Sequence, residues 1–323
     1  MRKQLSRIAG LVSGGVAWLR GRPRESVKPP ALPSPRSGSA GPSVRLIVQP
    51  DDGVEPVLEG IARARRRLDV SIFRLDDKHV TKAVQAAVAR GVTVRALVAH
   101  RNSEGAKELR ALEAWLLAAG ATVCRTHDDL LRYHYKMMVV DRRILYVFGF
   151  NFTRQDIERS RSFGLVFRNR HLVREATRLF EADCARKPFT PRSQSLVVSP
   201  HNARERLSAL LRGARRRLLV YGADVDDPAM IRLLAERARA GVDVKIVGRV
   251  AGKGTGLRVR PLARRRLHVR AIVQDSRCVF IGSQGLREVE LDRRREVGVI
   301  VKDAKVVRAV AALFAEDWAD RRR

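Results

Sequence analysis

Apolar and polar residues follow a regular order from Val44 to the end of the chain. Short β-branched apolar runs, typical of buried strands, alternate with longer segments in which apolar residues recur every three or four positions, typical of helices. In the first half this pattern predicts strands at 44–50, 68–75, 92–100, 136–141, 144–149 and 163–168, and helices at 54–67, 78–91 and 171–187. The alternation of strands and helices predicts an α/β fold with a mixed sheet flanked by helices.

The second half repeats this order. It predicts strands at 195–200, 217–225, 242–250, 268–275, 278–283 and 297–303, and helices at 204–217, 228–241 and 306–320. At an offset of 150 residues, 64–68 aligns with 214–218; further on the offset falls to 134, so the first half carries 16 extra residues. These residues lie within 104–129, where 107–120 predicts a helix that the second half lacks. We therefore expect tandem domains, 44–190 and 191–323, related by a pseudo-twofold axis.

Composition narrows the range of partners. The chain has 323 residues, enough for two cores, and its 65 Lys and Arg against 34 Asp and Glu give a formal charge of +31. Such an excess predicts a polyanionic partner, either an anionic membrane, a nucleic acid or a phosphorylated substrate, although an arginine-rich proteome is an alternative cause. Three cysteines without metal-ligand spacing indicate a reducing compartment, no disulfide framework and no zinc site.

Residues 1–43 differ from the rest of the chain. A stretch rich in Pro, Ser and Gly from Pro29 to Ser43 predicts a linker. Ahead of it, apolar residues between Leu5 and Leu19 fall near helical spacing among basic residues, in a stretch too short to span a bilayer. This leader is either disordered or a basic amphipathic anchor on an anionic membrane, and it lacks a clear signal-peptide cleavage site. We expect a cytoplasmic protein, peripheral on the membrane if the leader binds it.

One group of polar residues occurs in both halves. Its members are His134, Lys136 and Asp141, and, at the offset of 134, His268, Arg270 and Asp275. A single loop histidine would carry little meaning, but two histidines at equivalent positions of a repeat favour catalysis. A pseudo-twofold axis would bring both histidines to one phosphate.

The pattern H-x-K-x4-D, followed closely by Gly and Asn, resembles the signature of the phospholipase D superfamily. Its members include phospholipases, cardiolipin and phosphatidylserine synthases, and nucleases. The resemblance covers both halves from about residue 44. It implies tandem phospholipase D-like domains, a monomer whose single site is completed within the chain, and chemistry without metal or cofactor.

The resemblance also implies roles for individual residues. A histidine can attack phosphorus when neutral and protonate the leaving alkoxide when charged, because its pKa is near neutrality. We assign His134 as nucleophile and His268 as general acid. The reverse assignment stays open, because the family carboxylate that orients an imidazole is intact as Glu296 in the second half. The remaining residues are Lys136 and Arg270 as phosphate clamps, Asn151 and Ser283 as substrate-binding groups, and Asp141 and Asp275 as structural residues of the motif loops.

Each half departs from the family pattern in its own way. Arg270 stands where the family has lysine, and its planar guanidinium aims its donors differently from an ammonium. Gly285 stands opposite Asn151 in the repeat. Ser162 stands opposite Glu296, with Asp156 or Glu158 as candidate replacements for the missing carboxylate.

Substrate choice is open among three classes. The basic leader and the positive charge favour a lipid phosphodiesterase or a cardiolipin-synthase-like phosphatidyltransferase acting on anionic phospholipid. Arginine runs such as 65–67 and 215–217 would suit a nuclease, although an aromatic content of 5% gives few platforms for base stacking. These runs are also explained as charge at helix C-termini. The eroded motifs support a third class, a phosphate-binding scaffold without activity.

Overall fold

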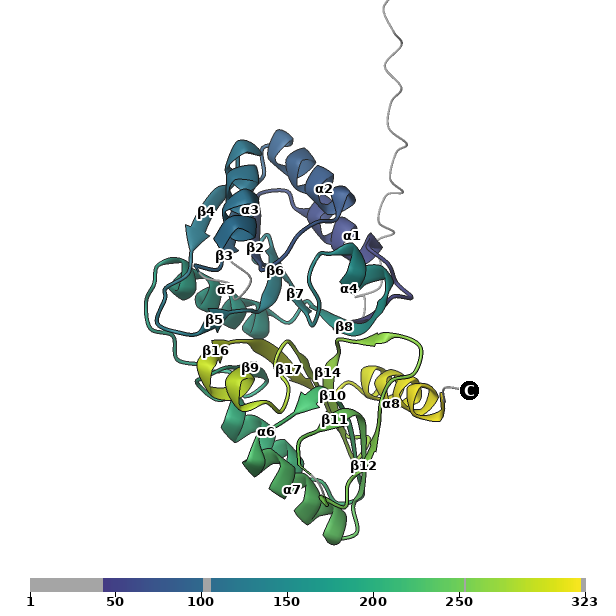
Figure 1. Cartoon of the computed structure of the whole chain (residues 1–323). Coiled ribbons are helices and arrows are strands. Elements are labelled where there is room, and N and C mark those ends of the chain that lie inside the picture. Colours follow the sequence, from purple (N-terminus) through teal and green to yellow (C-terminus); the bar gives the residue numbers. More distant parts are fainter. Residues whose placement is uncertain (1–42, 101–105, 253, 321–323) are drawn as a thin grey trace, which may run out of the picture. The chain divides into compact units, whose positions relative to one another are not determined.

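The computed structural model describes residues 43–100, 106–252 and 254–320 (Figure 1). The predictions for the leader therefore lie outside the described residues, apart from Ser43. Residues 41–323 group into one compact unit. Within the described ranges, no helix combines the length and apolar character that crossing a bilayer requires.

The first half forms a mixed sheet, as predicted. Its strand order is β1-β8-β7-β6-β2-β3-β4; β2, β3 and β4 are parallel neighbours, and the other neighbours are antiparallel. The strands are β1 (Val44–Gln49), β2 (Arg67–Ile72), β3 (Thr93–Val98), β4 (Thr122–Arg125), β6 (Lys136–Val140), β7 (Ile144–Phe148) and β8 (Ser160–Phe167). The helices are α1 (Glu55–Arg63), α2 (Lys78–Ala89), α3 (Ala106–Ala118), α4 (Arg154–Glu158) and α5 (Arg170–Cys184). Helix α3 is the predicted helix of the insertion.

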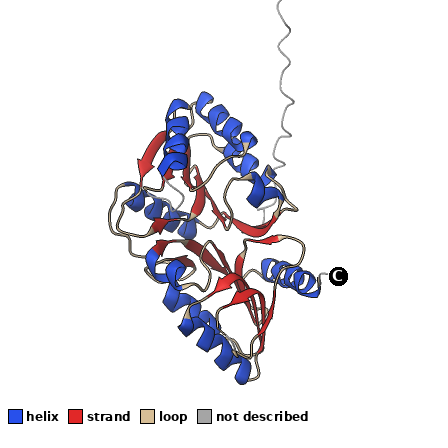
Figure 2. Ribbon diagram, viewed as in Figure 1, coloured by secondary structure: helices blue, strands red, loops and turns tan. Residues whose placement is uncertain are grey.

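The second half forms a sheet of its own, flanked by helices (Figure 2). Its strand order is β12-β11-β10-β14-β15-β17-β9. The strands are β9 (Leu196–Val198), β10 (Arg217–Val225), β11 (Asp243–Val250), β12 (Arg258–Arg260), β14 (Arg270–Gln274), β15 (Cys278–Gly282) and β17 (Val297–Val301). The helices are α6 (Ala203–Arg212), α7 (Pro228–Arg239), the π-helix η1 (Val289–Arg293) and α8 (Ala304–Ala319).

Short strands join the two halves reciprocally. Strand β5 (Arg132–Tyr133) pairs with β16 (Arg294–Arg295), and strand β13 (Arg266–Leu267) pairs with the start of β8. The backbone N–H of His134 donates to the Arg295 carbonyl at 2.8 Å, and that of His268 donates to the Arg161 carbonyl at 3.1 Å. These paired contacts are equivalent at the offset of 134, which is the pseudo-twofold relation that the repeat predicts.

Two buried ion pairs also cross between the halves. Arg161 Nε lies 3.0 Å from Asp317, and Arg295 Nη2 lies 3.2 Å from Asp183. Asp317 also accepts a hydrogen bond from the Tyr221 hydroxyl at 2.6 Å, and Asp183 accepts one from the Tyr135 hydroxyl at 3.0 Å. Removing one partner of such a pair leaves a buried charge unmatched, so these contacts fix how the halves meet.

The halves share a hydrophobic core. One continuous cluster of buried residues runs from β1 and β6 through β15 and β17 to α8, and a smaller cluster lies under α6 and α7. The boundary at 190 and 191 falls in the loop between α5 and β9, and we retain it as a proposal for the domain division. The three cysteines, Cys124, Cys184 and Cys278, are free thiols.

The first helix of each half ends earlier than predicted. Helices α1 and α6 end at Arg63 and Arg212, four and five residues before the ends of the predicted helices at 67 and 217. The prediction was wrong because the backbone N–H groups that follow are taken by a distant carboxylate. Those of 65–67 donate to Asp141 at 2.8–3.0 Å, and those of 215–217 donate to Asp275 at 2.7–2.9 Å. The arginine triplets therefore lie in the turns that lead into β2 and β10.

Candidate active site

The two motif histidines line one cavity. Each precedes the first residue of an inner strand by two positions, His134 before β6 and His268 before β14. The reciprocal pairing of β5 with β16 and of β13 with β8 turns these strand starts toward each other. Both histidines line a cavity of about 500 Å³, and each side chain is only 11% exposed. The cavity thus lies between the two halves.

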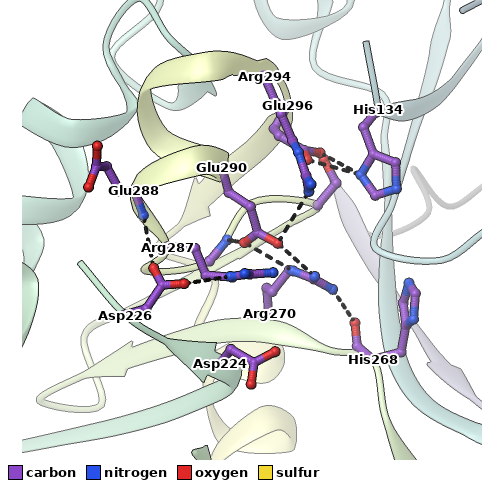
Figure 3. Close-up of polar contacts among 12 residues, drawn as sticks. His134, Asp224, Asp226, His268, Arg270, Arg287, Glu288, Glu290, Arg294 and Glu296 are labelled. Atoms are coloured by element: carbon purple, nitrogen blue, oxygen red, sulfur yellow. Dashed lines mark hydrogen bonds and ion pairs between the residues drawn. The ribbon is translucent and has the colours of Figure 1, made fainter. Parts of the chain in front are cut away.

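His134 is held by a carboxylate from the other half. Its Nδ1 lies 2.9 Å from Oε1 of Glu296, which is fully buried (Figure 3). Its Nε2 lies 2.9 Å from Nζ of Lys136, and the edge of its ring packs against Phe73 with the ring centroids 4.5 Å apart. A proton on Nδ1 donated to Glu296 leaves Nε2 with a free lone pair facing the lysine.

Burial and charge hold this histidine in its neutral form. Burial, followed by the neighbouring Lys136 and Arg270, lowers the pKa of His134 well below its ordinary value. Burial also lowers the pKa of Lys136 to about 7, although Glu296 opposes the shift. Burial raises the pKa of Glu296, with Lys136 and a hydrogen bond from Ser283 acting against it. Neutral His134 is therefore available as a nucleophile near neutral pH.

His268 has a different carboxylate. Its Nε2 lies 3.6 Å from Oδ2 of Asp156, a residue of α4. Burial lowers the pKa of His268 well below its ordinary value, while Asp156 acts in the opposite direction. Of the two carboxylates considered as replacements at this position, Asp156 lies at the site, whereas Glu158 pairs with Arg154 on the surface. Ser162, which stands opposite Glu296 in the repeat, is buried.

Asp156 is itself well satisfied. It accepts from the backbone N–H and the side-chain amide of Asn151 at 2.9 and 2.8 Å, and from Arg266 at 2.6 Å. Burial raises the pKa of Asp156, but His268, the two Asn151 donors and Arg266 together hold that pKa below its usual value. A carboxylate stays charged beside His268, and it favours the protonated form that a general acid needs.

The predicted phosphate clamp Arg270 already has a carboxylate partner. Its Nη2 lies 2.8 Å from Oε1 of Glu290 and its Nε lies 3.4 Å from Oε2, while Nη1 donates to the His268 carbonyl at 3.0 Å (Figure 3). Arg270 lines the cavity, whereas Lys136 is not among the lining residues and is almost fully buried. Sequence reasoning missed Glu290, although the offset of 134 places it opposite Asp156.

The two predicted substrate-binding groups lie in different places. Asn151 lines the cavity with its amide donating to Asp156. Ser283 is not among the residues that line the cavity; its hydroxyl is bonded to the backbone of Val297, with the N–H donating to it at 3.1 Å, and it also bonds Glu296. Ser283 thus supports the carboxylate that holds His134, in place of the direct phosphate contact that we expected.

Asp141 and Asp275 lie at the far ends of β6 and β14 from the histidines. Each has a positive φ, of 50° and 51°, in the turn that follows its strand, and each accepts three backbone N–H bonds from an arginine triplet. These contacts tie each turn to the segment that leads into the neighbouring strand; the structural role of both aspartates stays a prediction from the family resemblance.

Several residues that the sequence did not single out complete the cavity wall. Glu108 and Leu112 come from α3, so the insertion of the first half forms part of the site. The other additions include five arginines, namely Arg74, Arg132, Arg266, Arg287 and Arg294, together with Phe73, Leu75, Asp76, Thr153, Gln155 and Glu290. Figure 3 shows Arg287 and Arg294 beside the Glu290 and Arg270 pair. The cavity suits a substrate with several negative charges.

The sequence profile of the family described as cardiolipin synthase, PLD-like domain, matches residues 57–184. This match covers the first copy of the motif, and the second copy faces it across the same cavity. The profile match and the relatives named as cardiolipin hydrolase support assignment to the phospholipase D superfamily. This superfamily is one of phospholipase D-like phosphodiesterases.

Individual relatives agree with this assignment. Mitochondrial cardiolipin hydrolase of Canis lupus familiaris is 24% identical over 185 residues, which cover 51% of this chain and 71% of that protein. A polyphosphate kinase from Porphyromonas gingivalis matches 86% of this chain with a TM-score of 0.71 and 20% identity; the match spans half of that kinase. Phosphatidylserine synthase from Haemophilus influenzae matches 85% of this chain and 86% of its own, with a TM-score of 0.65 and 11% identity. The two structural matches share the two-domain fold.

Proposed function

We propose that this protein cleaves or transfers phosphodiesters through a phosphohistidine intermediate, without a metal, and that its substrates are phospholipids. The observation that carries the proposal is the pair His134 and His268 in one cavity, the first neutral beside Glu296 and the second beside Asp156. The two environments suit a nucleophile and an acid, which is the division of labour that phosphodiester cleavage requires.

In the first step, Nε2 of His134 attacks phosphorus and the bond from phosphorus to the leaving oxygen breaks. His268 gives its proton to that oxygen, so the departing alcohol leaves neutral. In the second step, His268 takes a proton from water or from an acceptor alcohol, whose oxygen attacks phosphorus and releases His134. Water gives hydrolysis and an alcohol gives phosphatidyl transfer.

The cations act on the non-bridging phosphate oxygens. Lys136 reaches Nε2 of His134 at 2.9 Å, so a phosphate at that nitrogen lies within reach of its ammonium. Arg270 lines the same cavity but is held by Glu290 at 2.8 Å. We propose that Arg270 supplies charge to the transition state while Glu290 fixes its position.

Two observations favour a lipid substrate. The exposed large hydrophobic side chains of the described residues are Leu117 and Leu131, 55% and 51% exposed. Leu117 lies on α3, which supplies Leu112 to the cavity wall, and Leu131 directly precedes Arg132, another wall residue. Exposed apolar side chains on two segments that also supply wall residues suit a surface that meets a bilayer. The relatives named as cardiolipin hydrolase and the profile named for cardiolipin synthase point to the same substrate class.

A nuclease is the second candidate, and one surface favours it. Five exposed arginines gather around a shallow hollow at the turn between β6 and β7 and along α5, namely Arg142, Arg143, Arg168, Arg170 and Arg174. This turn lies at the opposite end of β6 from Lys136. A polyanion long enough to reach from this patch to the cavity could use both.

The test compares phosphatidylglycerol vesicles with a DNA oligonucleotide, each with chelator present, for wild type and His134→Asn. We expect histidine-dependent turnover of the vesicles, with radiolabelled phosphate retained on alkali-denatured wild type and released by acid. Histidine-dependent cleavage of DNA alone would favour the nuclease, and inhibition by the chelator would contradict the metal-free mechanism. Folded wild type that turns over neither substrate and forms no phosphoenzyme would favour the scaffold class.

A further inference from the structure

Two equivalent arginines of the repeat have unlike surroundings. Arg266 of β13 is neutralised, since its Nη1 lies 2.6 Å from Asp156 and 3.1 Å from the Ser160 hydroxyl. Arg132 of β5 stands at the equivalent position in the other half. Within the described parts of the chain, its guanidinium has no carboxylate partner and instead lies 5.4 Å above the ring of Phe73. The pseudo-twofold axis thus relates a neutral side of the cavity to a cationic side.

A second arginine adds to the cationic side. Arg294 is the direct register partner of Arg132 in the pairing of β16 with β5, so both side chains leave the ribbon on the same face. Both line the cavity. The residue equivalent to Arg294 on the neutral side is Ser160. The cationic side therefore carries a second arginine that the neutral side lacks at this position.

The carboxylate nearest to Arg294 is already engaged. Glu290 Oε1 lies 4.0 Å from Arg294 Nη1 but 2.8 Å from Arg270, and Oε2 accepts from the Gly285 N–H at 2.7 Å (Figure 3). The Nε of Arg294 is buried and has no hydrogen-bond partner among the described residues. One carboxylate therefore serves two guanidinium groups, and it mainly serves Arg270.

Two neighbouring guanidinium groups without matched carboxylates are unfavourable by themselves. Burial, followed by the charge of Arg294, lowers the pKa of Arg132. A bound anion with several oxygens would offset both the desolvation and the repulsion, through charge-assisted hydrogen bonds to two planar donors. Clusters of this kind in a cavity are characteristic of ligand sites.

The cationic side adjoins the proposed nucleophile. Phe73 packs its ring against His134 with the centroids 4.5 Å apart, and the guanidinium of Arg132 lies over the same ring. Glu296, which holds His134, follows Arg294 by two residues along the chain. An anion between Arg132 and Arg294 would therefore lie beside the phosphate that His134 attacks.

We propose that Arg132 and Arg294 bind a second phosphate of the substrate, next to the phosphate that is cleaved. The inference rests on the proposed function and narrows it to substrates with two phosphates joined by a short linker. This chemistry has two sources, a phospholipid with a phosphate on each end of one glycerol, or successive phosphates of a polynucleotide.

The first test measures binding to the full chain by calorimetry, with small probes in matched pairs. One pair is glycerol with a phosphate on both terminal hydroxyls against glycerol with one; the other is thymidine with two sugar phosphates against thymidine with one. We expect the bisphosphate of one pair to bind about 10-fold more tightly or better than its monophosphate, since a charge-assisted contact contributes roughly 1.5–3 kcal/mol. The pair with the larger ratio identifies the lipid or the polynucleotide source.

Variants assign that preference to the two arginines. Arg132→Gln and Arg294→Gln should each bring the ratio close to unity, and Arg132→Lys should restore part of it. Arg232→Gln removes the same charge from an exposed position on α7, away from the cavity lining, and should leave the ratio unchanged. Equal binding of both members of each pair by wild type, or a preference that survives both glutamine variants, would overturn the proposal. Thermal unfolding of each variant confirms that the change is local.

Turnover provides the second readout and separates this inference from the function it rests on. With cardiolipin against phosphatidylglycerol, or with a longer against a minimal nucleotide diester, Arg132→Gln should lower kcat/KM about 10-fold for the substrate with two phosphates and less than about 2-fold for the other. Equal losses for both would mean that Arg132 contacts the cleaved phosphate. If wild type binds bisphosphates preferentially but turns nothing over, the subsite stands and the proposed activity fails.

Discussion

The two halves of the site are built from the same repeat but treat their histidines differently. His134 has a buried glutamate at 2.9 Å from Nδ1 and a lysine at 2.9 Å from Nε2. His268 has an aspartate at 3.6 Å from Nε2, and the position equivalent to the glutamate is Ser162. One imidazole is thus fixed in a single tautomer with its Nε2 lone pair facing Lys136, while the other lies beside a carboxylate that favours its protonation.

Under the proposed function, this difference gives the two equivalent histidines of the repeat separate roles. In a symmetric pair either histidine could attack phosphorus. Here the loss of the carboxylate at Ser162 and the use of Asp156 at His268 divide the roles between the halves. The structure thereby favours the assignment of His134 as nucleophile, which the sequence had left open because Glu296 belongs to the second half. Glu296 acts across the axis on the histidine of the first half.

The largest effects should follow from removing the histidines themselves. His134→Asn and His268→Asn should each lower turnover of a natural diester by about 1,000-fold or more, since the two act as a unit. A nitrophenyl diester separates their roles, because its leaving group departs without a proton. With that substrate His134→Asn should form no phosphoenzyme, whereas His268→Asn should form one that persists for lack of a base. Quenched-flow trapping of labelled phosphate provides the measurement.

The reverse pattern, in which only His134→Asn accumulates phosphoenzyme, would exchange the two roles. Substantial turnover of the natural diester by either variant would contradict the pairing itself. Circular dichroism and thermal unfolding are the controls, since both histidines sit at strand starts where backbone pairing joins the halves.

Substitutions at Glu296 and at the equivalent Ser162 should differ strongly in their effect on kcat. Glu296→Gln keeps the shape but loses the charge that fixes His134, and we expect kcat to fall on the order of 100-fold or more, by analogy with orienting carboxylates of catalytic triads. Ser162→Ala, the matched change in the other half, should cost less than about 3-fold because the buried Ser162 hydroxyl has no hydrogen-bond partner among the described residues, whereas Glu296 bonds His134. Steady-state kinetics up to saturating substrate, measured for both variants, separates an effect on kcat from an effect on KM.

The pH dependence tests which groups must be protonated. Lys136 has a pKa lowered to about 7 by burial, and burial also keeps the pKa of His268 below its ordinary value. Both must carry a proton in the first step, so kcat/KM should already fall as pH rises through the lowered pKa of His268, and should fall further through about 7 as Lys136 loses its proton. His134 must be neutral to attack, and its pKa is lowered well below 6.5. The loss of kcat/KM on the acidic side of the pH profile should therefore lie well below pH 6.5. Glu296→Gln removes a charge that raises the Lys136 pKa, so the basic limb should move to lower pH.

Much of the fold and part of the site follow from the sequence, because a repeat carries its own internal comparison. Strand and helix order, the extra helix α3 and the approach of His134 to His268 all derive from periodicity and offset. The exact ends of α1 and α6 did not, because their N–H groups are satisfied by Asp141 and Asp275, more than 50 residues away. Local propensity contains no information about such distant partners.

The hydrogen-bond partners of the polar site residues could not be predicted from the sequence either. Arg270 was predicted as a phosphate clamp. Its bond to Glu290 depends on the π-helix η1, which the periodicity of apolar residues does not predict. Ser283 was predicted at the phosphate because its neighbours fit the family pattern, yet its hydroxyl turns toward Val297 and Glu296. The chain position of a polar residue fixes its neighbourhood, whereas its rotamer and partners are set by packing from the other half.

The smallest difference between the halves should be at the motif aspartates, where the contacts are alike. Asp141 and Asp275 each accept three backbone N–H bonds, and in both the carboxyl pKa is held low by those bonds against the opposing effect of burial. We expect Asp141→Asn and Asp275→Asn to lower the free energy of unfolding by similar amounts, about 1–3 kcal/mol, with kcat at moderate temperature nearly unchanged. Because a lowered pKa stabilises the fold only while the carboxylate is charged, the gap from wild type should close as pH falls below about 4. Denaturant unfolding across pH measures this, and a large loss of kcat in a stably folded variant would show that these aspartates reach the chemistry after all.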